Sequence, residues 1–336
     1  MTIQEQPTPN STAKNGTPHA PGPRPPRPKP LNITGWINLD KPVGVTSTDM
    51  VTAIKRLLNA AKAGHAGTLD PLATGILPIA LGEATKTLYY VTDTMKAYTF
   101  TITWGEQRDT DDREGQVIAT SQNRPTPDQI TALLPDFIGH IMQTPPQYSA
   151  VKINGERAYA LARAGQTVEI APREIYIETL TLEDTTADTA TLSCTCGKGT
   201  YVRSIARDMA EKLGTKGHIS ALRRTRVGCF NEKNAISLDS LREKMAQHTP
   251  QEIVLPLGQA LDDIPALQLN QTEAARISSG NPVDLLTRAD VDRLTLAGLD
   301  PRLTDDTLAL AKRDNRDVAL LSVTGARLTP VRVFNH

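Results

Sequence analysis

Asp70 is the residue whose type and surroundings most clearly suggest chemistry. It lies in a segment from Gly64 to Gly75 that reads GHAGTLDPLATG. The three glycines permit backbone conformations that other residues avoid, and Pro71 disfavours helical geometry at Asp70. From Gly64 to Pro78 the sequence contains no Lys, Arg, Glu or second Asp. The pattern is typical of a loop that presents one carboxylate, and its charged partner must come from elsewhere. An Asp before Pro is also an ordinary turn residue, so the loop alone does not establish function.

A lone carboxylate can act directly, as a nucleophile or as a general base. The sequence has no Gly-x-x-x-x-Gly-Lys-Ser/Thr phosphate-binding loop and no paired-glycine nucleotide fingerprint after a strand. Aspartyl-phosphate chemistry is disfavoured because Asp70 is followed by Pro71 and Leu72, with no second aspartate two residues away. We therefore expect Asp70 to attack a carbon electrophile, without a cofactor or a metal ion.

The segments on either side of the Asp70 loop predict the elements that position it. Residues 35–42 alternate apolar and polar residues, which predicts a short strand before a Pro-Val-Gly turn. Residues 46–49 form an N-cap cluster, and apolar residues at helical spacing follow up to Leu58. The apolar run 76–81 comes after the loop. The loop therefore follows a strand, a turn and a helix.

Two further segments alternate with the two-residue period of a half-buried strand. In residues 97–104 the larger side chains, from Tyr98 to Trp104, share one face and threonines share the other. In residues 189–196 Cys194 and Cys196 lie on the apolar face. No second Cys/His pair follows them at the spacing of a zinc site, so we expect both cysteines in the core.

Positive charge concentrates between Tyr201 and Arg226, although Lys and Arg balance Asp and Glu over the whole chain. This segment begins with an amphipathic helix that ends before Gly214. The whole segment carries seven Lys or Arg against two acidic residues. Such a block is typical of a surface for a phosphate-rich partner. For Arg207 we instead expect an ion pair with Glu211, one helical turn later.

The remaining segments are less regular. Residues 124–139 predict a capped helix. Residues 144–173 combine prolines, a polar turn and a short helix, and are either a surface excursion or a positively charged finger for a polyanion. Beyond about residue 262 short alternating segments predict a small β-rich module.

Length and composition indicate a large domain and a small one in 336 residues. No run of about 18 apolar residues indicates a membrane span, and the N-terminus lacks the apolar stretch of a secretory signal. The three cysteines provide no disulfide framework. We therefore expect a cytoplasmic protein. Residues 1–31 predict a disordered tail, since residues 1–30 contain nine prolines and no apolar periodicity.

The Asp70 loop resembles the catalytic loop of the TruB family of tRNA pseudouridine synthases. Other segments are similar to that family's motifs in the same order, and they read LDKP, GEATK, KAY, GKGTYVR and LRRT, starting at residues 39, 82, 96, 197 and 222. Residues 272–283 resemble the opening of a PUA-type RNA-binding module. The resemblance implies an α+β fold with a mixed, mainly antiparallel sheet flanked by helices. It implies a catalytic domain over 32–260 with a thumb-like excursion at 144–173, and a PUA-like domain over 265–336.

The resemblance also implies an activity and roles for six residues. The reaction is conversion of the T-loop uridine of tRNA, position 55, to pseudouridine. Asp70 would attack the flipped nucleotide at the pyrimidine ring or at the sugar C1′, and both points of attack remain open. Arg203 would be the counter-charge that keeps Asp70 ionised in a dry site. The other four residues would contact the substrate: His65, Tyr98, Tyr201 and Leu222.

In these roles Tyr98 would stack on the uracil and His65 would fill the gap that the flipped base leaves, while Tyr201 and Leu222 would line the base pocket. The expected partner is the T stem-loop of tRNA, bound by a monomer without a metal ion or membrane. Two alternatives remain: a guide-RNA-dependent pseudouridine synthase, and a tRNA-folding chaperone whose chemistry is incidental or lost.

Overall fold

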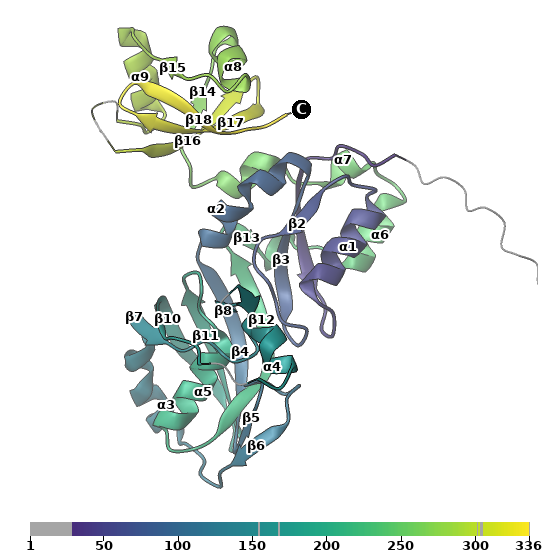
Figure 1. The fold of residues 1–336 in the computed structure, drawn as a ribbon, viewed down its shortest axis with the longest axis vertical. Coiled ribbons are helices and arrows are strands. Elements are labelled where there is room, and N and C mark those ends of the chain that lie inside the picture. The colour runs from purple at the N-terminus through teal and green to yellow at the C-terminus, as the bar shows by residue number, and fades with distance from the viewer. Residues whose placement is uncertain (1–28, 154, 167–168, 301, 303–304, 336) are drawn as a thin grey trace, which may run out of the picture.

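The computed structural model describes residues 29–335 except 154, 167–168, 301 and 303–304. Most of the predicted N-terminal tail lies outside the described residues. Leu31, its last residue, pairs by backbone hydrogen bonds with Asn59 and Ala61. Figure 1 shows an elongated molecule in which a large sheet with flanking helices is joined to a smaller sheet at one end. None of the described helices is both long enough and apolar enough to cross a membrane.

The large sheet has nine strands, and its neighbours pair antiparallel except for β3 and β12, which run parallel. This confirms the predicted mixed, mainly antiparallel sheet. Across the sheet the main path is β1 (Gly35–Lys41), β3 (Thr74–Leu81), β12 (Gly217–Val227), β4 (Lys96–Trp104), β11 (Thr189–Cys196), β10 (Arg173–Thr185) and β7 (Gly139–Gln143). Two short strands extend it, β2 (Ala63–His65) beside β3 and β13 (Phe230–Asn231) beside β12.

Helices flank this sheet where the sequence predicts them. Helix α1 (Ser47–Leu57) begins with a capping box between Thr46 and Asp49, and α5 (Val202–Lys212) ends just before Gly214, whose φ is +67°. The predicted helix over 124–139 is wrong in length: α3 (Pro127–Leu133) is short and a 3₁₀ turn, η2 (Leu134–Phe137), follows it. Proline at the second position of that turn has no N–H to continue the α-helical ladder. The other flanking elements are η1 (Gly82–Thr87), α2 (Leu88–Asp93), η3 (Glu232–Asn234), α6 (Leu238–Met245), α7 (Pro250–Ile253) and η4 (Leu257–Leu261).

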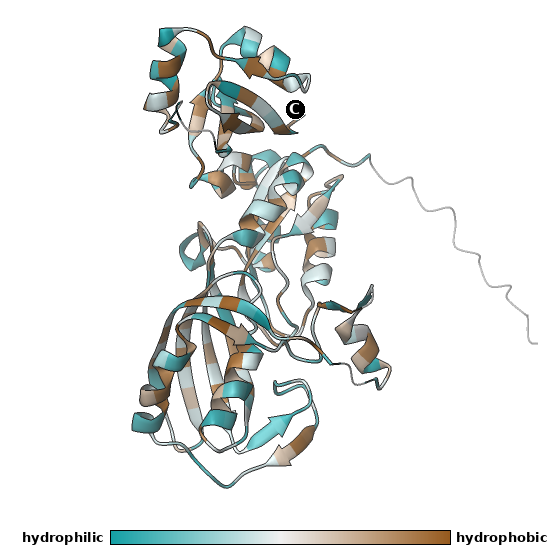
Figure 2. Cartoon of the chain, turned by 60° about the vertical axis from the view of Figure 1, so that its left-hand side comes forward, coloured by the Kyte–Doolittle hydropathy of each residue, from teal (hydrophilic) through white to brown (hydrophobic). Residues whose placement is uncertain are grey.

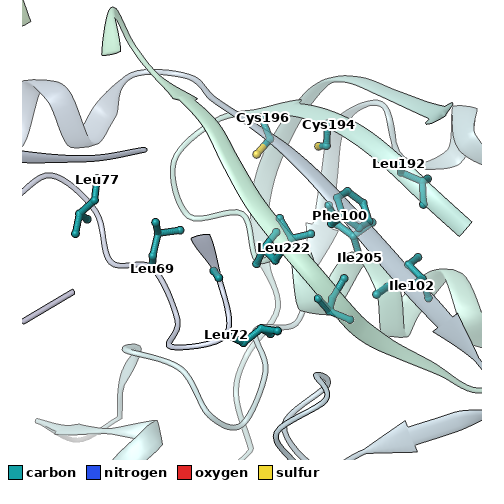
Figure 3. Close-up of a cluster of buried hydrophobic side chains, with 14 of the residues drawn as sticks. Leu69, Leu72, Leu77, Phe100, Ile102, Leu192, Cys194, Cys196, Ile205 and Leu222 are labelled. Carbon is teal, nitrogen blue, oxygen red and sulfur yellow. The ribbon is translucent and has the colours of Figure 1, made fainter. Parts of the chain in front are cut away.

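The core confirms the two-residue periods predicted for β4 and β11. Phe100, Ile102 and Trp104 are buried on one face of β4, and Cys194 and Cys196 are buried on the same side of β11. Figure 3 shows Phe100, Ile102, Cys194 and Cys196 in one cluster with Leu222 and with Leu69 and Leu72 of the Asp70 loop. The apolar core of the sheet and the loop are therefore packed together.

Strands β1, β2 and β3 join the rest of the large sheet at the end of the Asp70 loop, through the pairing of β3 with β12. Strands β3 and β12 pair only through Thr74 with Arg223 and Gly75 with Arg224. Gly75 has a φ of +98°, and a Cβ there would lie 2.2 Å from the Arg224 carbonyl oxygen. Only glycine fits this close backbone approach. The junction fixes the start of β3, and so fixes where the loop ends.

Two hairpins leave the large sheet. The strands β5 (Glu106–Arg108) and β6 (Val117–Thr120) form one of them. The other lies in the predicted excursion at 144–173 and consists of β8 (Lys152–Ile153) and β9 (Glu156–Arg157), followed by α4 (Ala158–Arg163). In Figure 2 α4 stands out from the body of the molecule.

The smaller sheet confirms that the C-terminal part is rich in β-structure, with the strand order β14-β16-β17-β18-β15. Its strands are β14 (Ala266–Gln268), β15 (Val283–Asp284), β16 (Thr307–Arg313), β17 (Arg316–Thr324) and β18 (Arg327–Val333). Two helices that the sequence did not indicate, α8 (Gln271–Ser278) and α9 (Arg288–Leu296), accompany it. Its own core is separate, but Leu310, Leu320 and Phe334 pack with Trp36 of β1.

Candidate active site

The backbone of the Asp70 loop is held by hydrogen bonds from two residues, Ser47 and Gly44. Ser47, at the start of α1, accepts a hydrogen bond from Leu69 N–H at 2.8 Å and donates one to Leu69 C=O at 3.0 Å. Gly44 N–H donates to Pro71 C=O at 2.8 Å. These contacts leave the Asp70 carboxylate free to project from a fixed loop. The Asp70 side chain is 35% exposed, so it is wetter than the dry environment expected from the sequence.

Arg203 approaches Asp70 from the first turn of α5. Its Nε lies 2.9 Å from Asp70 Oδ2, although the N–H is not directed at an acceptor. Its two terminal nitrogens donate to Thr110 C=O and Tyr148 C=O, each at 2.8 Å. Asp112 Oδ2 lies 3.8 Å from Nη1. The arrangement brings together the two residues for which catalytic roles are predicted, from segments more than 130 residues apart.

Lys41 supports the loop from β1. Its side chain is fully buried, and Nζ donates to Pro42 C=O, Val45 C=O and Pro71 C=O. Burial lowers the pKa of Lys41 to about 8, against the opposing effect of the Asp70 charge. Lys41 thus places a second positive charge beneath the same loop.

The sequence did not reveal the acidic loop that holds the arginines of α5. Asp111 and Asp112 are buried, and Arg207 Nη1 lies 3.2 Å from Asp111 Oδ2. Burial raises the pKa of Asp111 to about 6, while the charge of Arg207 acts against this rise. Arg207 also pairs with Asp208, so the expected ion pair with Glu211 is wrong. The only sequence signal was the cluster of aspartates in DTDD at 109–112.

The four residues predicted to contact substrate lie on four different elements. Tyr98 is partly buried on β4, on the same side as Phe100, and Leu222 on β12 pairs directly with Phe100. Tyr201 is the N-cap residue of α5, and its backbone exchanges two hydrogen bonds with the Gln143 amide. His65 ends β2 and is partly buried.

The electrostatics of these residues differ. Burial raises the pKa of Tyr98 to about 12, although the charge of Arg224 opposes this. Burial lowers the pKa of His65, and the charge of Arg224 lowers it further. The ring of Tyr201 lies under the guanidinium of Arg173, with 5.1 Å between Cζ and the ring centroid. Tyr98 and His65 are therefore neutral at pH 7, as stacking side chains for a base would be.

The basic block between Tyr201 and Arg226 is largely paired with other groups of the protein, so fewer of its charges are free for a phosphate-rich partner than the sequence suggests. Arg224 is buried, with only 1% of it exposed. Four others pair with carboxylates of the protein itself: Arg203 with Asp70, Arg207 with Asp111, Lys212 with Asp136 and Arg223 with Asp40. In the described part of the chain, only Lys216 and Arg226 of the seven lack a side-chain hydrogen bond or ion pair. Sequence spacing could not distinguish paired from free charges.

Over the described residues, no three His, Cys, Asp or Glu side chains come together as a metal-binding group.

Comparison with known proteins gives consistent matches over most of the chain. The family model described as TruB family pseudouridylate synthase (N terminal domain) matches residues 55–202. A second, tRNA pseudouridylate synthase B C-terminal domain, matches residues 203–262. A protein of Bradyrhizobium diazoefficiens named tRNA pseudouridine synthase B is 51% identical over 310 residues, which is 90% of this chain and 86% of that protein. Its namesake in Caulobacter vibrioides is 50% identical over 303 residues, or 90% and 96% of the two chains.

Solved structures agree on the fold. The structure of a Cbf5-Nop10-Gar1 complex contains a chain with a TM-score of 0.67 and 25% identity, and the match covers 90% of this chain and 85% of that one. An archaeal box H/ACA Nop10-Cbf5 complex gives a TM-score of 0.65 at 23% identity, with 90% and 86% covered. The Asp70 loop lies within residues 55–202, the part of the chain that the first family model matches. The chain belongs to the TruB family of pseudouridylate synthases.

Proposed function

We propose that this chain converts the T-loop uridine of tRNA, position 55, to pseudouridine. The relatives named tRNA pseudouridine synthase B support tRNA as the substrate. The observation that carries the assignment of roles is the contact between Asp70 Oδ2 and Arg203 Nε, 2.9 Å apart, in a loop packed beside Leu222. A partly exposed carboxylate beside a buried guanidinium is suited to nucleophilic attack on a bound nucleotide.

The isomerisation balances without an external redox partner. The bond from the sugar C1′ to uracil N1 breaks, and a bond from C1′ to C5 forms. The C5 hydrogen leaves as a proton and N1 gains one. Asp70 attacks either the pyrimidine ring or C1′, and in both cases the carboxylate is released when the new glycosidic bond is complete. Arg203 offsets the charge of Asp70 before attack.

Asp70 can react only with a nucleotide that has left the stack of the T loop. Extruding a base costs a few kcal/mol, which contacts in the enzyme must offset. We assign Tyr98 to stacking on the uracil, a contact worth about 1–3 kcal/mol for aromatic platforms. Leu222 and Tyr201 line the pocket, and neutral His65 fills the space that the flipped base vacates.

The test follows the C5 hydrogen. A T-arm hairpin labelled with tritium at uracil C5 is incubated with the protein alone, and release of label into water is measured. Wild-type protein releases the label, whereas Asp70→Asn binds the hairpin with similar affinity and releases none. If the wild-type protein binds the hairpin without releasing label, the chaperone alternative is favoured and the enzymatic proposal fails.

The same assay separates a stand-alone enzyme from a guide-RNA-dependent one. The chain is about 50% identical to proteins named for tRNA, but only 25% identical to the chain that it matches in the Cbf5-Nop10-Gar1 complex. We therefore expect release of label with no added RNA or protein. A requirement for a second RNA would support the alternative.

We further propose the domain division and the cellular context. Residues 32–260 form the catalytic domain, with 144–173 as an RNA-binding thumb, and residues 265–336 form a PUA-like domain. The protein acts as a monomer in the cytoplasm, where tRNA is modified. Light scattering of the protein with and without one equivalent of tRNA measures the stoichiometry, and a complex with two protein chains would contradict this proposal.

A further inference from the structure

Arg224 is a buried cation that forms no ion pair with any residue that the structure describes. It lies on β12 two residues after Leu222, and only 1% of it is exposed. Its contacts with the described residues are hydrogen bonds to uncharged groups. Burying a guanidinium in this way is costly, and an apolar side chain of similar volume would fill the space without that cost. Packing alone therefore does not explain an arginine here.

Arg224 donates hydrogen bonds to backbone carbonyl groups at both ends of the Asp70 loop. Nη2 donates to Gly67 C=O at 3.0 Å and Nη1 to Thr68 C=O at 3.4 Å, just before Asp70. Nε donates to Ile76 C=O at 2.7 Å, after the loop has entered β3. One rigid, planar group thus fixes the separation between the two ends of the loop.

The same guanidinium reaches the side chains around the expected nucleotide site. Arg224 is the register partner of Tyr98 across β12 and β4, so their side chains lie on the same face of the sheet, and the charge of Arg224 acts on His65 and on Asp70. Arg224 is therefore connected both to the backbone that carries the carboxylate and to the ring assigned to stacking. Leu222 comes from the same strand, so β12 supplies both the pocket wall and this connection.

We propose that Arg224 is a positioning residue for the isomerisation, which holds the Asp70 loop and the Tyr98 ring in a fixed relative position. The inference rests on the proposed function. When uridine is flipped into the site, its ring meets Tyr98 and its reacting carbon meets Asp70. An error of about 1 Å in that separation lowers the rate by about 100-fold while leaving the RNA contacts intact.

The first test compares Arg224→Lys and Arg224→Met with wild type on the labelled hairpin. Under single-turnover conditions with saturating protein, we expect the rate to fall by about 100-fold in Arg224→Met. Arg224→Lys keeps the charge but not the planar fork, and we expect an intermediate rate. Hairpin affinity stays within about threefold, because a buried side chain makes no contact with RNA. Arg226→Gln on the same strand is the matched control and keeps the wild-type rate.

A second test does not depend on activity. Fluorotyrosine is placed at position 98, and its ¹⁹F signal is compared between wild type and Arg224→Lys. Loss of the planar guanidinium changes the ¹⁹F chemical shift. In a separate measurement, the double variant that also carries Tyr98→Phe loses less rate than the sum of the two single variants predicts. An unchanged ¹⁹F signal, or wild-type rates in both Arg224 variants, overturns the proposal. If wild-type protein releases no tritium, the proposed function fails, while the ¹⁹F result still decides the positioning role.

Discussion

Asp70 and Arg203 differ in exposure, with 35% of the Asp70 side chain and 5% of the Arg203 side chain accessible. An ion pair at the protein surface is weak because water screens the two charges. The attraction becomes stronger when a bound nucleotide excludes water from the site. Arg203 is held independently by the carbonyl groups of Thr110 and Tyr148. In the proposed reaction Arg203 therefore stays in place as a counter-charge while Asp70 changes its bonding.

Replacing Arg203 should impair catalysis much more than binding. In Arg203→Met we expect the single-turnover rate to fall by about 100-fold or more, since a fixed charge at the reacting group is lost. Tritium release measures the rate, and filter binding measures hairpin affinity. Lys212→Met, on the same helix but paired with Asp136 at the surface, should leave both unchanged. A large loss of affinity with normal turnover of bound RNA would contradict this role.

His65 should make stability depend on pH. Its pKa is lowered below the ordinary value of 6.5 by burial and then by the charge of Arg224. The folded state thus disfavours the protonated ring, so stability is complete above pH 6.5 and is lost as the pH falls through the folded pKa. His218 contributes with the same sign, because burial also lowers its pKa.

Urea unfolding of wild type and His65→Gln above and below pH 6.5 measures the contribution of His65. We expect the free energy of unfolding to fall less on acidification in the variant, with the His218 part remaining. Equal losses in both proteins would show that His65 is not held neutral by its surroundings.

Among the elements, those with a strong local pattern were predictable. The two-residue period identified β4 and β11, and capping residues with apolar spacing identified α1 and α5. The loop of Asp70 was visible because glycine and proline restrict its backbone. The resemblance of several motifs to one family then predicted that Arg203 lies beside Asp70. Local sequence patterns could not predict this contact, because the two residues are far apart in the chain.

The contacts that were missed join residues far apart in the chain. Arg207 meets Asp111 across 96 positions, and Arg224 meets Gly67 across 157. Local charge density suggested a solvent-facing surface at these arginines, but the sheet register turns Arg224 inward next to Gly75. Helical spacing likewise suggested Glu211 for Arg207, because it could not reveal the loop that supplies Asp111.

The junction of β3 and β12 gives a prediction for glycine at position 75. Gly75→Ala combines a positive φ of +98° with a Cβ only 2.2 Å from Arg224 C=O, so the strands must separate. Gly44→Ala has a φ of +83° but no atom within 4 Å of its Cβ. We expect Gly44→Ala to cost about 1–2 kcal/mol from the backbone alone and Gly75→Ala at least about 3 kcal/mol. Urea unfolding measures both, and equal losses would contradict the steric account.

At the scale of the whole molecule, the two sheets are joined by packing and by a polar latch. The latch consists of Glu83 and Lys86 on η1, the Val333 carbonyl and the Asn335 N–H. Lys86 Nζ donates to Glu83 at 2.6 Å and to Val333 C=O at 2.8 Å, and Asn335 N–H donates to Glu83 at 2.7 Å. Because η1 follows β3 directly, one strand links the Asp70 loop to the C-terminal sheet.

Breaking the latch should uncouple the two sheets. Burial alone would raise the pKa of Glu83, but the hydrogen bonds from Lys86 and Asn335 outweigh it and lower the pKa below its ordinary value of 4.5. The latch therefore stabilises the protein above pH 4.5 and is lost as the pH falls through the folded pKa. Calorimetry at neutral pH should show one transition in wild type. In Lys86→Met we expect two, with the C-terminal sheet unfolding first, and a loss of about 1–2 kcal/mol.

The control for the latch is Arg327→Met, which breaks the exposed pair with Asp284 within the smaller sheet and should keep a single transition. Glu83→Gln should behave like Lys86→Met at neutral pH, but its stability should no longer fall on acidification through this carboxylate. Since packing of Leu310, Leu320 and Phe334 remains in every variant, two transitions would show that apolar contact alone does not couple the sheets. A single transition in Lys86→Met would show the reverse, that the shared apolar cluster is sufficient.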